Sequence, residues 1–353
     1  MTKLQSDNFI LNELQPVVQR NCHISDALHA SNYTLCVYLL KMREYYRWEQ
    51  HLSLDKTLDK GKIGRWLSQR ERFWESLEDV EYSNLPLQDA CFDPFSSDAI
   101  NRQLISQGFV YSAGYGVHSK PIFFLARLDR TVTEGDKNIY ISSHEFARDL
   151  TAPPAMSLGN SIFIRKESLQ RMLWEKIDEW RWNRLDNAMG RAIGFYDFDN
   201  AFETSLSAMT ENEITTLILH ESGEVLAGSL IEDGWHEMLA SSKHPQVELV
   251  ARAVRDHLAD ALTTLPALIE TASPSLHFYM ANLTGMRKHL IPSILNAYNG
   301  WLGTGNIDAL SDAVSQGEIH WLTQANRLIE VNIHRQTPVS LEEMEHLIAD
   351  AIL

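Results

Sequence analysis

The middle of the chain, residues 84–165, differs in composition from the segments on either side of it. Prolines and glycines are frequent there, and they bound short runs of β-branched and aromatic residues. Such runs are typical of β-strands. The pattern predicts three antiparallel strands with a turn at Glu134–Lys137, and a fourth candidate strand at 162–164. The three strands are expected at residues 109–113, 122–128 and 138–142.

The flanking segments favour helices. Residues 35–49 contain no glycine or proline and many large apolar side chains, which predicts a helix. A second helix is expected over residues 63–81, and the two would form a hairpin. Its inward side chains are predicted to be Trp66, Phe73 and Leu77.

Beyond residue 167, several short sequence patterns indicate where helices begin. Thr210–Glu213 has the letters of a capping box, which predicts a helix beginning there. Pro245 and Pro274 each suit the first position of a helix. Gly300–Asn306 is expected to be a loop, and Ser340 to cap a terminal helix.

These patterns predict a mainly α (α+β) protein, a multi-helix bundle with a small antiparallel β-sheet inserted mid-sequence. The expected segments are an N-terminal helical hairpin over 1–83, the sheet insertion over 84–165 and a C-terminal helical bundle over 166–353. No polar linker separates them, so one compact unit is expected overall.

Composition excludes several classes of protein. The chain has 353 residues, 44% of them hydrophobic, and a net charge of −16, which disfavours nucleic acids and acidic membranes as partners. No apolar run is long enough to span a membrane, and residues 1–8 lack the apolar core of a signal peptide. Cys22, Cys36 and Cys91 are too few for a disulfide framework. We therefore expect an acidic cytoplasmic protein.

The strongest functional candidate is the stretch Leu217–Leu226, where charged residues interrupt an apolar helix. His220 and Glu224 are four residues apart and therefore share a helix face. Because buried ionisable groups are costly unless paired or coordinated, both are predicted metal ligands, with Glu221 as a base. The zinc-peptidase pattern His-Glu-x-x-His is not matched, since Glu224 stands in place of its second histidine.

Further ligands are expected from other helices. His257 and His277 lie on the two predicted helices that follow, each among apolar residues, and facing helices of a bundle commonly assemble metal sites. Glu44 is the ligand predicted from the N-terminal hairpin. Each histidine also fits a simpler interpretation, a core imidazole satisfied by one polar partner.

Two functions follow. The first is a metal-dependent enzyme acting on a small organic substrate, with iron, manganese or zinc held by the His/Glu site. The second is a non-catalytic protein–protein interaction or scaffold protein, in which a buried His/Glu/Arg network is structural. The expected partners are a small molecule or another protein, a homo-oligomer being compatible with either, and neither nucleic acid nor membrane is expected.

Overall fold

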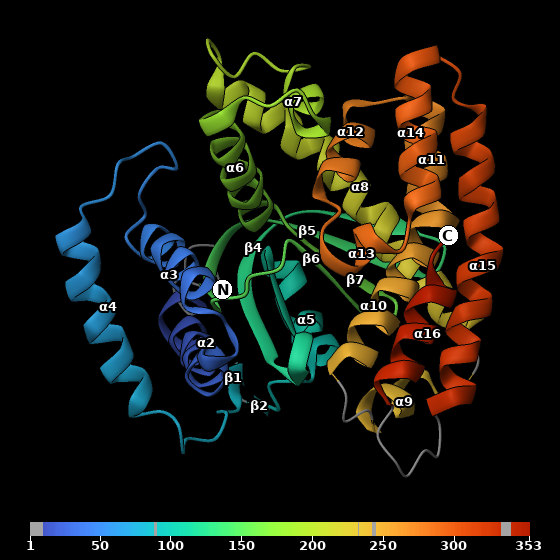
Figure 1. Ribbon diagram of the computed structural model, residues 1–353. Helices are drawn as coiled ribbons and strands as arrows, with labels where there is room; N and C mark the ends of the chain where they lie inside the picture. Colours follow the sequence, from blue (N-terminus) through green and yellow to red (C-terminus); the bar gives the residue numbers. More distant parts are fainter. Residues whose placement is uncertain (1–9, 88–89, 232, 242–244, 333–339) are drawn as a thin grey trace. The chain divides into compact units, whose positions relative to one another are not determined.

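The computed structural model describes residues 10–87, 90–231, 233–241, 245–332 and 340–353 (Figure 1). The N-terminal segment 1–8, judged above for a signal peptide, lies outside these residues. The chain is α+β and mainly helical, and it forms two compact units, residues 1–174 and 175–353. None of the helices in the described part is long and apolar enough to cross a membrane.

The first unit is built on a five-stranded sheet with the order β3-β4-β5-β7-β6. The bounds are β3 (Phe109–Tyr115), β4 (Pro121–Glu134), β5 (Lys137–Arg148), β6 (Ala155–Leu158) and β7 (Ser161–Arg165). The three predicted strands are confirmed, as is the turn between β4 and β5, where Glu134 pairs with Lys137.

The prediction of a wholly antiparallel sheet is wrong. β7 lies beside β5 and runs parallel to it, while β6 pairs with β7 at the edge of the sheet. The sequence showed one strand at 162–164 but gave no sign of β6, whose residues Ala-Met-Ser-Leu carry no β-branched side chain. Because β6 was not predicted, the direction of β7 relative to β5 could not be inferred from the sequence.

Helices and a small hairpin complete the first unit. The helix α2 packs against β4 and β5, and its Val18 and Cys22 share a buried cluster with Phe109, Phe123 and Leu125. The other elements are the short π-helix η1 (Ile10–Leu14), α2 (Gln15–His29), α3 (Leu35–Glu49), α4 (Lys60–Glu75), the hairpin strands β1 (Leu85–Leu87) and β2 (Ala90–Phe92), and α5 (Ser97–Leu104).

The helix α3 has the predicted bounds. Of the three side chains predicted to face inward from the next helix, Leu77 is buried and Trp66 packs against the same cluster, but Phe73 does not. Phe73 is 42% exposed, whereas Trp74 is buried and its indole N–H donates to His23. The helix also ends at Glu75, before Leu77. The prediction that Phe73 faces inward is therefore wrong, because hydrogen bonding to α2 selects the neighbouring tryptophan.

The second unit is helical in its described residues. Its core contains Val250, Val254 and Leu258 of α10 together with Trp321 of α15, and α15 packs against α10, α14 and α16. The bounds are α6 (Lys166–Asn183, which begins in the first unit), α7 (Ala188–Ile193), α8 (Phe202–Leu230), α9 (Trp235–Ser241), α10 (Pro245–Ala259), α11 (Leu265–Thr271), α12 (Pro274–Asn282), α13 (Gly285–His289), α14 (Pro292–Thr304), α15 (Asp308–Asn332) and α16 (Leu341–Ala351).

The predicted helix starts at Pro245 and Pro274 are confirmed, and Ser340 forms a capping box with Glu343. The start at Thr210 is wrong. Thr210 lies inside α8, where its hydroxyl donates to Leu206 O. The predicted loop at 300–306 is also largely wrong, since α14 continues to Thr304.

Candidate metal centre in the second unit

The helices α8 and α10 approach each other closely at Gly223. A Cβ atom at this glycine would lie 2.5 Å from Thr263 Oγ1 and closer still to the carbonyl oxygen of Ala259. Thr263 Oγ1 also donates to Leu219 O at 2.7 Å. This contact brings the His220 turn of α8 against the end of α10.

A π-helix, η5 (Asp260–Thr264), interrupts the helix at this point and continues into α11. Such π-turns are rare, and they occur frequently at functional sites. Its first residue, Asp260, is fully buried. The local irregularity therefore coincides with a buried carboxylate.

Asp260 is surrounded by three donors. His220 Nδ1 donates to its carboxylate at 2.7 Å, Tyr279 donates its hydroxyl at 2.8 Å, and the Arg287 guanidinium completes the set. Burial opposes ionisation, but His220 and Arg287 hold the pKa of Asp260 well below its usual range. The contact with Asp260 also shifts the pKa of His220. Burial would lower the pKa of His220, and Asp260 raises it to about 9.

His220, Glu224 and Asp256 form the candidate metal site. One ligand atom from each residue lies within 4.8 Å of the others, and all three residues are partly exposed. Two of the three are predicted ligands, and Asp256 comes from α10. Burial raises the pKa of Asp256 to about 6, partly offset by Arg287.

Two arginines also contact these carboxylates. Arg255 forms an ion pair with Glu224 at 3.0 Å, and Arg287 lies 3.5 Å from Asp256. Each carboxylate of the cluster therefore has a cationic neighbour in the structure.

The structure does not bring the other predicted ligands into this group. His257 donates Nε2–H to Arg287 O at 2.8 Å, and its ring stacks on Trp321. Burial, followed by Arg287, lowers the pKa of His257 to about 3.

His277 is hydrogen-bonded through Nδ1 to the Tyr298 hydroxyl at 2.8 Å and stacks on Trp301. Glu44 belongs to the first unit, where it forms ion pairs with Arg43 at 2.7 Å and Arg47 at 3.0 Å. Glu221, the predicted base, directly follows His220 in α8, and its side chain is buried.

Asp256 and Asp260 were not among the ligands predicted from the sequence. Their spacing of four residues was the available signal, since it is the spacing of His220 and Glu224. The partner helix could not be inferred, because it depends on how α8 and α10 cross.

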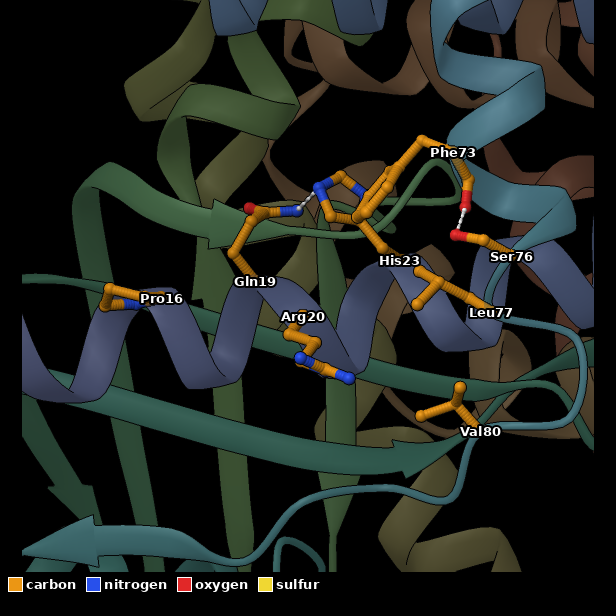
Figure 2. Close-up of a pocket in the computed structure, with 8 residues that line it drawn as sticks. All are labelled: Pro16, Gln19, Arg20, His23, Phe73, Ser76, Leu77 and Val80. Atoms are coloured by element: carbon orange, nitrogen blue, oxygen red, sulfur yellow. Dashed lines mark hydrogen bonds between the residues drawn. The ribbon is translucent and has the colours of Figure 1, made fainter.

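The first unit contains a cavity of about 470 Å³ between α2 and the end of α4 (Figure 2). His23 Nδ1 accepts a hydrogen bond from the Trp74 indole N–H at 3.3 Å, and His23 Nε2 lies 2.9 Å from the Arg70 guanidinium. Burial and then Arg70 lower its pKa to about 3, so the imidazole is neutral near pH 7. The lining residues are Pro16, Gln19, Arg20, His23, Phe73, Ser76, Leu77 and Val80.

Comparison with known families assigns both parts of the chain. Residues 13–165 match the N-terminal domain, and residues 170–351 the C-terminal domain, of a family of unknown function, DUF6866. The chain belongs to the DUF6866 family. The candidate metal site lies within the DUF6866 C-terminal domain. Neither a curated protein nor a solved structure matches the chain.

Proposed function

We propose that the DUF6866 C-terminal domain binds one divalent transition-metal ion through His220, Glu224 and Asp256, and that it is a metal-dependent enzyme acting on a small organic substrate. The observation that carries this proposal is the approach of three ligand atoms, from two helices, to within 4.8 Å of one another. We also propose the organisation predicted from the sequence, in which a C-terminal helical bundle follows a sheet insertion.

The hydrogen bond from His220 to Asp260 supports the proposal. Histidines that bind metals usually donate their second ring N–H to a carboxylate or carbonyl, which fixes the tautomer and makes the free nitrogen more basic. His220 donates Nδ1–H to the Asp260 carboxylate, which leaves Nε2 as the proposed ligand atom. One imidazole and two carboxylates suit iron, manganese or zinc. Glu221 is the proposed base.

Charge distribution also favours cation binding in this domain. Residues 175–353 contain 26 Asp and Glu but only 11 Lys and Arg, so nearly all of the net charge of −16 lies there. A field of this sign raises the local concentration of cations around a partly exposed site.

The ion pairs of Arg255 and Arg287 favour a second candidate function. With His220 protonated, the three carboxylates Glu224, Asp256 and Asp260 are matched by three cations. In this alternative the cluster is a structural network that holds the helices together, and the protein is a non-catalytic interaction or scaffold protein.

A measurement of metal binding by the full chain distinguishes the metal-dependent enzyme from the structural network. Metal-depleted protein would be titrated with Zn²⁺, Mn²⁺ or, without oxygen, Fe²⁺ in a calorimeter, and its metal content measured after reconstitution. Asp256→Asn and Glu224→Gln are expected to weaken binding by about tenfold or more, as losses of ligands or their supports do. Glu248→Gln is the matched control, because Glu248 lies on α10 and pairs only with Arg252 among the described ion pairs.

The structural network predicts the reverse result. Wild-type protein would then hold no stoichiometric metal even after reconstitution, and that result would refute the metal site. His220→Ala would still lower the melting temperature, because it leaves the buried charge of Asp260 without a main partner.

A further inference from the structure

A second cavity of the first unit, of about 440 Å³, lies where α2, the end of α3 and β5 meet. It shares only Gln19 with the cavity of Figure 2. Part of its wall is apolar, formed by Leu11, Trp48 and Phe146, and the rest is polar. Ligand sites commonly combine an apolar wall with a few convergent polar groups.

Two histidines face this cavity from different elements. His144 lies on β5 and His51 directly after α3, and their ring centroids are 6.2 Å apart. The side chain of His144 is 46% exposed, and His51 is exposed. His51 also has a φ of 49°, a conformation that costs a non-glycine residue energy and is found preferentially at functional sites.

A carboxylate outside the cavity lining orients His144. Nδ1 of His144 lies 3.1 Å from a carboxylate oxygen of Glu167, which is in the first turn of α6. The hydrogen bond to Glu167 is the main cause that raises the pKa of His144, and burial opposes it. The hydrogen bond to Glu167 occupies Nδ1, and when the ring is protonated its Nε2–H can donate to an acceptor.

The carboxylates in the lining already have partners. Glu145 accepts from Arg165 and from Ser168 at 2.6 Å, and Glu49 accepts from Trp66 and forms an ion pair with Arg70. The polar groups left to meet a ligand are therefore mainly imidazoles, which donate when protonated. The two rings, with centroids 6.2 Å apart, are close enough for both to donate to one anion that lies between them.

We propose that this cavity binds a small organic carboxylate, with its carboxylate group between His51 and His144 and its apolar body against Leu11, Trp48 and Phe146. A metal ion is a poorer fit, because the described residues of this cavity do not supply three ligand atoms close together. The proposal concerns the DUF6866 N-terminal domain and is independent of the metal site in the other unit.

The test is calorimetric titration of the full chain with benzoate and with hexanoate, which present the same anion on an aromatic and an aliphatic body. At least one is expected to bind saturably with one site per chain. Benzamide has nearly the shape of benzoate without its charge, and it should bind about tenfold more weakly, the value of one charge-assisted hydrogen bond.

Substitutions of the two histidines test whether the carboxylate binds in this cavity. His144→Gln and His51→Asn should each weaken carboxylate binding by about tenfold. Asparagine is chosen at position 51 because it tolerates a positive φ. His320→Gln, on α15 in the other unit, is the matched control and should leave binding unchanged. Thermal melts establish that each variant is folded.

Three results would overturn the proposal. The first is the absence of saturable binding for both carboxylates. The second is equal binding of benzamide and benzoate, which would reduce the cavity to an apolar site. The third is unchanged affinity in both folded histidine variants.

Discussion

Replacement of Gly223 by alanine tests the helix contact on which the candidate metal centre depends. A new Cβ atom would lie 2.5 Å from Thr263 Oγ1 and closer to the Ala259 carbonyl oxygen, so α8 and α10 must move apart. The carbonyl belongs to the backbone of a helix and cannot rotate away. Overpacking of this kind costs about 1–3 kcal/mol.

The net effect must include the intrinsic preference of helices for alanine. Alanine is favoured over glycine inside a helix by about 1 kcal/mol, so the clash is partly offset. We expect Gly223→Ala to lower the free energy of unfolding by up to roughly 2 kcal/mol after this offset. The same displacement should weaken metal binding, since it separates His220 from Asp256 and Asp260.

Gly228 provides a control on the same helix. A Cβ atom there would meet only Arg255 Nη2, at 3.7 Å, which is ordinary contact. Gly228→Ala should therefore raise stability by about 1 kcal/mol. Urea denaturation followed by circular dichroism would measure both variants. Equal stabilities of the two variants would show that α8 and α10 are not in close contact at Gly223.

Three further predictions concern buried groups. Burial raises the pKa of Glu213 to about 7, opposed by its hydrogen bond from Ser275, so its contribution to stability is complete below pH 4.5 and lost as pH rises through 7. Relative to Glu213→Gln, the wild type should lose about 3 kcal/mol between pH 4.5 and 8 in denaturant titrations, and parallel pH profiles would contradict this. Leu173→Ala and Leu258→Ala should each cost about 2–5 kcal/mol, because both side chains are fully buried; losses below about 1 kcal/mol at both sites would disprove the assigned core. Cys22 is buried and its thiol pKa is raised, so a thiol reagent should modify two cysteines in the native protein and a third only after unfolding, and immediate reaction of all three would contradict its burial. The two reactive thiols are Cys36 and Cys91.

Where the determining interactions are local, the sequence alone was sufficient. The absence of glycine and proline together with the density of large apolar residues located α3 with its bounds. The terminal capping box at Ser340 was also predicted correctly, because both of its hydrogen bonds join residues three apart. His220 and Glu224 were paired for the same reason, since one turn of helix fixes their relation.

Local patterns failed where a second element decides between alternatives. The letters of a capping box at Thr210 fit a helix start, but the residues before them continue α8, and the threonine hydroxyl bonds back along the helix. Periodicity predicted that Phe73 faces inward, but the neighbouring Trp74 is the buried side chain, and its hydrogen bond to His23 on α2 holds it there.

The candidate site shows the same division between local and tertiary information. Sequence alone determined that His220 and Glu224 share a face. Tertiary structure decided that the approaching element is the π-turn carrying Asp260, that Asp256 completes the group, and that Glu44, His257 and His277 have other partners. The physical reason is that spacing along a helix is set by backbone geometry, whereas the partner across a helix contact is set by how side chains of distant segments pack.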